Sequence, residues 1–393
     1  MAEWIECKIS DLGTVVGGAT PSTKKAENYE GGNIAWITPK DLSTFSGRYI
    51  QRGERNITEI GLKSCSTQLL PENTVLFSSR APIGYVAIAA NEVCTNQGFK
   101  SVIPNEATDP LFLFYLLKHN KDKIETMGSG TTFKEVSGNT MKNIVVNVPA
   151  DKEIQTKIAS LLGAIDDKIE ENERINNNLE QQAQAIFENE FLSLQSLPDG
   201  WKLASLIDIA DYLNGLAMQK YRPSANEIGI PVLKIKELRQ GCCDDNSEFC
   251  SPSIKSDYII HDGDVIFSWS GSLLVDFWCG GICGLNQHLF KVSSSKYDKW
   301  FYYAWTKHHL NRFIAVAADK ATTMGHIKRD ELAKAEVLIP NEADYNRIGA
   351  LLQPIYDLII SNRIENKKLA ETRDSLLPKL MSGEIDMSEV DYE

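Results

Sequence analysis

Two long stretches of the sequence carry the pattern of an amphipathic helix. Between residues 151 and 191, and again between 341 and 381, apolar residues recur at alternating intervals of four and three. This heptad spacing predicts two long helices, each with one seam. The first seam consists of Ile158, Leu162, Ile165, Ile169, Asn172, Asn176, Leu179, Ala183 and Ile186, and the second of Ile348, Leu352, Ile355, Ile359, Asn362, Asn366, Leu369, Arg373 and Leu376.

Two asparagines interrupt each seam at the same places. A polar residue in a seam costs stability and commonly fixes the register of pairing. We therefore expect an antiparallel coiled coil in which Asn172 faces Asn366 and Asn176 faces Asn362. The alternative is that these side chains face solvent on two ordinary amphipathic helices. The same register pairs Leu162 with Leu376, Ile169 with Leu369, Leu179 with Ile359 and Ile186 with Leu352.

Two residues disturb the second helix. Arg373 falls opposite Ile165 in this register, so its guanidinium is expected to reach out to water. Pro354 lacks an amide hydrogen. It is expected either to kink the helix or to delay its regular part until after that position.

The stretches before each helix have the pattern of strands. Short runs rich in β-branched and aromatic residues, such as NTVLFSS at 73–79 and GDVIFSW at 263–269, alternate with Gly, Pro, Asn and Asp turns. Each stretch also contains one aromatic helical segment, at 110–119 and 299–309, which we interpret as a core helix rather than a platform for stacking bases. The pattern therefore predicts two α+β units.

The two halves of the chain repeat each other at an offset of about 190 residues. Residues 34–42 correspond to 230–238, and Asn96-Gln97 corresponds to Asn286-Gln287. We therefore expect an α+β protein in which two pseudo-repeated domains are separated by two long helices that form an antiparallel coiled coil. The expected boundaries are a first domain at 1–149, a helix at 150–193, a second domain at 194–340, a helix at 341–382 and an acidic tail at 383–393.

Composition and charge are those of a globular protein whose acids are unevenly placed. Hydrophobic residues make up 42% of the chain and charged residues 24%. No apolar run approaches the about 18 residues of a membrane span and no signal pattern opens the chain, so we expect a cytoplasmic protein. The net charge of −12 argues against nucleic acid at first sight, but outside the helices and tail it is only −1. A local basic face is therefore possible there.

The sequence contains none of the common catalytic motifs. There is no phosphate-binding loop, no HExxH and no GxSxG, and the six histidines and eight cysteines show no metal-ligand spacing. We expect no enzyme, no metal site and no cofactor in this chain. Polar loops carry cations that suit contact with phosphates and base edges. The candidates for DNA contact are Lys24, Lys25, Arg80 and Lys134 in the first domain and Lys220, Arg222, Lys320 and Lys328 in the second.

Several short motifs accompany this order of domain and helix. They are Gly18-Ala-Thr-Pro21, Ile34-Ala-Trp36, Arg80-Ala-Pro-Ile-Gly84, Asn96-Gln97, Gly130-Thr-Thr132, Glu153-Ile-Gln155 with Ile158-Ala159 and Ile165-Asp166, and Leu377-Pro-Lys-Leu-Met-Ser-Gly-Glu-Ile385. With these motifs the chain resembles the specificity subunit of a type I restriction-modification system. The resemblance covers essentially the whole chain, and its departures lie mostly in the second half, where Pro354 and residues 342–346 differ from the family pattern.

The resemblance implies a non-catalytic subunit with two target-recognition domains. Each domain would read one half of a bipartite, asymmetric site in double-stranded DNA. The helices would set the spacing and dock two methylating subunits that carry S-adenosylmethionine, and restriction subunits that use ATP and magnesium would join them. The alternative is a coiled-coil scaffold protein whose two domains bind ligands other than DNA.

Overall fold

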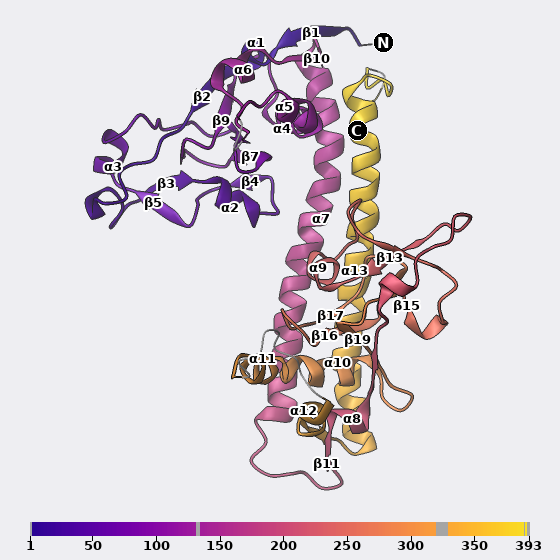
Figure 1. The fold of residues 1–393 in the computed structure, drawn as a ribbon. Coiled ribbons are helices and arrows are strands. Elements are labelled where there is room, and N and C mark those ends of the chain that lie inside the picture. The colour runs from indigo at the N-terminus through magenta and orange to yellow at the C-terminus, as the bar shows by residue number, and fades with distance from the viewer. Residues whose placement is uncertain (1, 131–133, 320–328, 389, 391–393) are drawn as a thin grey trace. The chain divides into compact units, whose positions relative to one another are not determined.

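The computed structural model describes residues 2–130, 134–319, 329–388 and 390. It divides into two compact units, which we call unit 1, with residues up to 170 and from 369 onward, and unit 2, with residues 171–368. Each unit combines one β-rich part with segments of both long helices (Figure 1). The two long stretches of heptad spacing therefore contribute to both units.

Unit 1 contains three sheets within its described residues. The first pairs β1 (Trp4–Lys8) antiparallel with β10 (Val145–Pro149). The second has the strand order β2 (Gly13–Gly17), β9 (Lys100–Pro104), β6 (Val75–Ser79), β7 (Ile83–Ala89) and β4 (Tyr49–Ile50). The third has the order β5 (Arg55–Ile57), β3 (Ile34–Ile37) and β8 (Cys94–Thr95). The shorter helices are α1 (Ile9–Leu12), α2 (Pro39–Ser43), α3 (Glu59–Lys63), α4 (Pro110–His119), α5 (Lys121–Thr126) and α6 (Gly138–Asn143).

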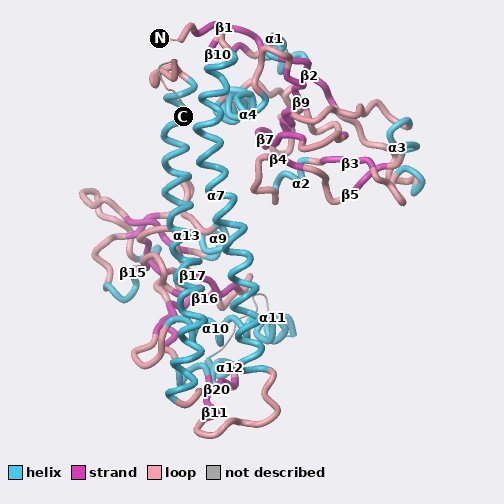
Figure 2. The backbone as a smooth tube through the Cα atoms, turned by 180° about the vertical axis from the view of Figure 1, so that it is seen from behind, coloured by secondary structure: helices cyan, strands magenta, loops and turns pink. Residues whose placement is uncertain are grey.

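Unit 2 repeats most of this strand arrangement, with four strands in its second sheet and four in its third among the described residues. Its first sheet pairs β11 (Lys202–Ser205) with β20 (Glu336–Ile339). Its second sheet has the order β12 (Asp211–Asn214), β19 (Leu289–Ser293), β16 (Val265–Ser268) and β17 (Leu274–Phe277). Its third sheet has the order β14 (Phe249–Cys250), β13 (Ile230–Leu233), β18 (Cys283–Leu285) and β15 (Ile259–Ile260). The shorter helices are α8 (Leu206–Ile209), α9 (Ile235–Gln240), α10 (Lys299–His308), α11 (Leu310–Asp319) and α12 (Arg329–Ala333). The internal repeat of the sequence is thus also a repeat of strand pairing. In both units the strands are short and long loops join them (Figure 2).

The aromatic segments 110–119 and 299–309 lie in the cores, as predicted. Phe112 and Tyr115 of α4 are fully buried among the apolar residues of unit 1, and Phe301 and Tyr303 of α10 are buried in unit 2. Because these rings have no exposed face, they cannot stack on bases. Their burial instead packs each β-rich part against the long helices of its own unit.

The long helices are α7 (Lys152–Phe187), which continues as a π-helical turn at Glu188–Leu192, and α13 (Glu342–Met381). Of the two expectations for Pro354, a kink or a regular helix only after it, the second is wrong, because α13 runs through this residue as one helix. Pro354 and Ala350, whose carbonyl loses its usual donor, are both exposed. Water can therefore hydrogen-bond the carbonyl that proline leaves free.

Hydrogen bonds join the seam asparagines of α7 and α13 within unit 2. Asn172 Nδ2 donates to Asn366 Oδ1 at 2.8 Å, and Asn362 Nδ2 donates to Asn176 Oδ1 at 2.9 Å. Asn172, Asn176 and Asn362 are buried, which contradicts the alternative that the asparagines face solvent. Each pair of seam asparagines therefore forms a hydrogen bond between the two helices.

Arg373 of α13 does not reach out to water, and this expectation was wrong. Its side chain is 16% exposed, and NH1 donates to Asp166 Oδ1 of α7 at 2.6 Å. The other carboxylate oxygen of Asp166 accepts a 2.5 Å hydrogen bond from the hydroxyl of Tyr115. The guanidinium stays inside because Asp166, which is next to the seam position Ile165, supplies a counter-charge there.

Candidate nucleic-acid interface

Parallel strand pairs position the same loops in each unit. In unit 1, β3 runs parallel to β8, and in unit 2, β13 runs parallel to β18. The carboxyl ends of parallel strands meet at one edge of a sheet, so the residues that follow them lie together. These residues are 38–40 and 96–98 in unit 1 and 234–236 and 286–288 in unit 2. We call each set, together with the nearby glycine segment 18–20 in unit 1 or 215–217 in unit 2, the strand-end surface of that unit.

A glycine brings a third segment onto each strand-end surface. A Cβ atom at Gly18 would lie 2.2 Å from the Thr95 carbonyl oxygen, and a Cβ at Gly215 would lie 2.2 Å from the Asn286 carbonyl oxygen. Only glycine permits so close an approach of two backbones. Residues 18–20 and 215–217 are thereby fixed against the repeated Asn-Gln turns, and the two surfaces are built alike.

In unit 2 the strand-end surface is hollowed into a pocket of about 440 Å³. Its wall carries hydrogen-bonding and cationic side chains from three separate segments of the chain. They include Gln219, Arg222, Lys234, Lys236, Gln287 and His288. Such a set can bind phosphate oxygens and can also donate to base edges.

A glutamate neutralises two of these cations. Glu248 accepts from Lys234 Nζ at 2.5 Å and lies 2.9 Å from Arg222 NH2. The hydrogen bond and charge of Lys234 are the main causes that hold the pKa of Glu248 below its usual value. Lys236 is likewise paired with Asp244 at 2.8 Å, and this hydrogen bond lowers the pKa of Asp244 to about 2. The carboxylates stay ionised and hold the cations at the pocket.

Unit 1 uses a glutamate in the same way. Glu135 lies 3.6 Å from Arg80 NH1 and 3.4 Å from Lys100 Nζ. A backbone bridge between Arg80 and Glu135 places Lys134, which is exposed, next to this cluster. The structure therefore brings Arg80 and Lys134 together on one side of unit 1.

The other predicted cations are distributed as follows. Lys24 and Lys25 are exposed on a turn, where Lys25 lies 3.6 Å from Glu27. Lys220 is the last residue of the short 3-10 helix Met218–Lys220. The other two residues of this helix line the pocket of unit 2, and so does Arg222. Lys320 and Lys328 lie outside the described residues.

Sequence reasoning missed Lys100, Lys234 and Lys236 and both bridging glutamates. Lys234 and Lys236 fall within residues 230–238, which match 34–42 in the repeat, so the repeat itself could have identified them. The glutamates gave no such signal. Their pairing depends on loops that only the folded chain brings together.

One arginine ties the β-rich part of each unit to its long-helix segments. In unit 1, Arg48 lies just before β4 and is 6% exposed; it donates to Glu170 at 3.0 Å and also to Asp167, both on α7. In unit 2, Arg363 of α13 donates to Asp276 of β17 at 2.6 Å and to Glu180 of α7 at 2.9 Å. These charge-assisted hydrogen bonds join the β-rich part of each unit to the helix segments of the same unit.

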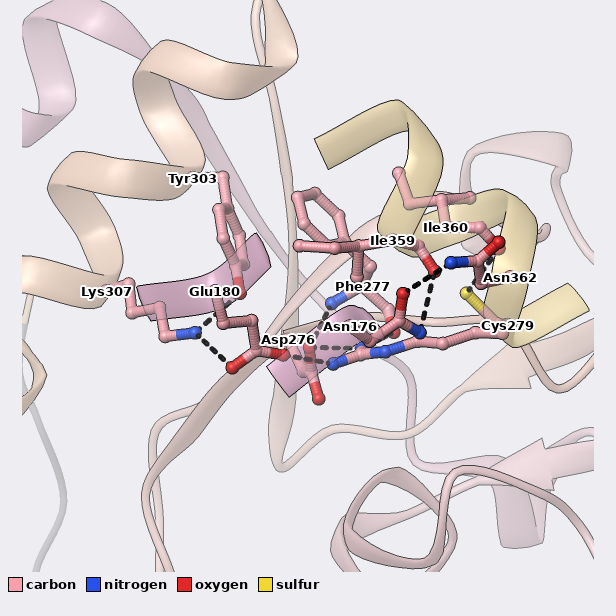
Figure 3. Close-up of polar contacts among 11 residues, drawn as sticks. Asn176, Glu180, Asp276, Phe277, Cys279, Tyr303, Lys307, Ile359, Ile360 and Asn362 are labelled. Carbon is pink, nitrogen blue, oxygen red and sulfur yellow. Dashed lines mark hydrogen bonds and ion pairs between the residues drawn. The ribbon is translucent and has the colours of Figure 1, made fainter. Parts of the chain in front are cut away.

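In unit 2 the charged groups around Arg363 also contact the buried core helix α10. Figure 3 shows Lys307 beside Glu180 and Tyr303, and it also shows the hydrogen-bonded pair Asn176 and Asn362. Lys307 Nζ lies 3.1 Å from the Tyr303 hydroxyl. Glu180 of α7 therefore pairs with cations from both α13 and α10, namely Arg363 and Lys307.

No group of histidine, cysteine, aspartate and glutamate side chains within the described ranges could hold a metal ion. The helices that the structure describes include none with the length and apolar character needed to cross a membrane.

Comparisons with known proteins identify relatives over the whole chain. The family described as "Type I restriction modification DNA specificity domain" matches residues 1–181 and 198–371. The chain is similar to the type I restriction enzyme MjaIX specificity subunit of Methanocaldococcus jannaschii, with 35% identity over 99% of this chain and 95% of that one. It is also similar to the HindI specificity subunit of Haemophilus influenzae, with 22% identity over 98% of this chain and 100% of that one. Its fold is similar to the crystal structure of a type I restriction-modification S subunit from M. genitalium, with a TM-score of 0.60, 14% identity and 96% coverage of both chains.

Proposed function

The chain belongs to the type I restriction modification DNA specificity family, and we propose that each of its two target-recognition domains reads one half of a bipartite, asymmetric DNA site. It is the DNA-recognition subunit of a restriction-modification complex and is not itself the catalyst. The observation that carries the division into half-sites is the repeated strand-end surface. Two similar surfaces with different side chains suit two different short sequences.

The domains in this proposal are residues 1–149 and 194–340, joined by helices at 150–193 and 341–382, with an acidic tail at 383–393. The helices pair as an antiparallel coiled coil, which the hydrogen bonds of Asn172 with Asn366 and of Asn176 with Asn362 support. The apolar layers of the same register contribute to the coil, including Ile169 with Leu369. A fixed register suits a spacer, because a slip would change the distance between the half-sites.

Two methylating subunits dock on the helices, and restriction subunits complete the complex. S-adenosylmethionine, ATP and magnesium belong to these partners in the proposal, and this chain holds no cofactor. The partners also supply part of the phosphate contact, which accounts for DNA binding by a chain of net charge −12. The alternative of a scaffold that binds ligands other than DNA has no support among the relatives.

Salt-dependent binding tests the function. The assembled complex with methylating subunits is expected to bind bipartite duplex DNA with an affinity that falls steeply with salt. Replacing Lys134, Lys220 and Arg222 by glutamine should weaken binding to all sequences and lower the salt slope by about 1 for each lost phosphate contact. The exposed Lys202 of β11 provides the control, and its replacement by glutamine should leave the slope unchanged. A complex that binds duplex DNA without salt dependence would contradict the proposal.

A second prediction concerns the glutamate at the pocket of unit 2. Glu248→Gln should strengthen binding to non-specific duplex DNA about threefold to tenfold, because it frees Arg222 and Lys234 and removes a charge that repels phosphates. Titration by fluorescence anisotropy at several salt concentrations measures the change. Glu336→Gln on β20 is the matched control, since this exposed residue lies outside the strand-end surface. Equal or weaker binding by the Glu248 variant would show that phosphates do not approach these cations.

A further inference from the structure

Gln97 and Gln287 occupy equivalent positions on the two strand-end surfaces. Each directly follows the asparagine of the repeated turn, Asn96 or Asn286. The backbone amide of Asn96 donates to the last residue of β3, and that of Asn286 donates to the last residue of β13. The two glutamine side chains can therefore be compared directly.

The residue that faces the glutamine differs between the units. In unit 1 the hydroxyl of Thr20 donates to Gln97 Oε1. Thr20 corresponds to Ala217, since both stand two residues after the closely packed glycine. Ala217 has no hydroxyl to donate. Within the part of the chain that the structure describes, Gln287 Oε1 is buried and accepts no hydrogen bond.

The other end of the Gln287 amide is held weakly. Its Nε2 lies 3.5 Å from His288 Nε2, which is longer than a normal hydrogen bond. The side chain lines the pocket whose wall also carries Arg222 and Lys234. A buried carbonyl oxygen without a donor costs free energy, and a donor on a bound molecule would recover it. Turning this side chain toward a ligand in the pocket is therefore favourable.

We propose that Gln287 is a specificity-determining residue that reads an adenine in the half-site of the second domain. Oε1 accepts from the adenine N6 amino group and Nε2 donates to N7, the bidentate pairing that glutamine makes in the major groove. Gln97 differs because Thr20 already occupies its Oε1. Equivalent positions then read the two half-sites differently. This inference rests on the proposed function, since it requires that the pocket face DNA bases.

The test pairs side-chain variants with base analogues in the assembled complex. Methylation mapping first gives the site, and each adenine of the second half-site is then replaced by purine, which lacks the N6 amino group, or by 7-deazaadenine, which lacks N7. At one position each analogue should weaken binding by the unmodified protein about tenfold. Gln287→Met should bind the normal site about as weakly and should lose no further affinity with either analogue.

Two further variants separate base reading from a folding defect. Ala217→Thr places a hydroxyl donor beside Oε1, as Thr20 does in unit 1, so the penalty for purine should shrink while that for 7-deazaadenine persists. Gln97→Met is the matched control and should leave every adenine penalty in the second half-site unchanged. The thermal unfolding midpoint should be the same for all variants, which shows that they fold.

The outcomes distinguish the two levels of the argument. If the complex shows no sequence-specific binding at all, the proposed function fails. If specific binding persists, the function stands. The adenine assignment is overturned if purine and 7-deazaadenine weaken binding by Gln287→Met as much as they weaken binding by the unmodified protein, at every adenine of the second half-site. Loss of the analogue penalty in Gln97→Met as well would also overturn it.

Discussion

Replacing Arg373 by leucine is expected to lower the free energy of unfolding of unit 1 by about 3–5 kcal/mol. Arg373 NH1 donates to Asp166 Oδ1 at 2.6 Å, and the Asp166 side chain is only 7% exposed. The variant leaves the carboxylate buried, with the hydrogen bond from the Tyr115 hydroxyl still in place but without its ion pair to Arg373. An uncompensated buried charge is among the costliest changes in a protein interior, so we expect a large effect.

Amide hydrogen exchange measures this effect within the intact chain. Protection of α4, which carries Tyr115, should fall in Arg373→Leu, while protection of α10 in unit 2 should hold as an internal reference. The double variant Asp166→Leu with Arg373→Leu removes both charges and should return to within about 1 kcal/mol of the unmodified chain. Unchanged protection of α4 in the single variant would mean that Asp166 is stabilised by water instead.

A chain that ends at residue 193 is expected to form a two-fold dimer with a new DNA specificity. It lacks residues 369–393, whose Leu377 and Leu380 pack with Leu162 in the core of unit 1. A second copy can cover that surface with the later part of its own helix. In the two-fold register Asn172 of one copy meets Asn176 of the other, and Ile169 meets Leu179, so polar again faces polar.

With methylating subunits, this dimer should modify an interrupted palindrome made of the first half-site twice, whereas the full chain modifies an asymmetric site. Sedimentation at micromolar concentration and methylation mapping measure the two effects. The same fragment with Leu179→Asp and Ile186→Asp is the control. It should remain monomeric, because these substitutions place charges in the new seam. A monomeric unmodified fragment, or methylation at the asymmetric site, would refute the prediction.

Much of this fold follows from local pattern. The heptad intervals identify both long helices, and the matched Asn-Gln turns and strands identify the repeat that the two sets of sheets then display. The aromatic segments 110–119 and 299–309 are predicted to be core helices, and their rings are buried. Heptad spacing depends only on neighbours in the sequence, and the repeat only on comparing the chain with itself, so neither requires knowledge of contacts in the folded chain.

The errors have a common physical origin. The seam places Arg373 opposite Ile165, but the neighbouring Asp166 decides where the guanidinium goes. Pro354 is tolerated because its side of α13 faces water, which periodicity alone did not settle. In both cases the energy depends on what surrounds a residue in three dimensions, and the spacing of apolar positions carries little of that information.

The candidate site divides in the same way. The sequence by itself determined that two similar domains carry polar, cationic loops, that each is followed by a long helix, and that asparagines mark the register. Only the tertiary structure decided which loops meet at the strand ends, that Glu248 and Glu135 each join two cations, and that Gln287 lacks the partner that Gln97 has. The reason is that hydrogen bonds and ion pairs act over a few ångströms, and parallel strand pairing sets those distances between residues far apart in the chain.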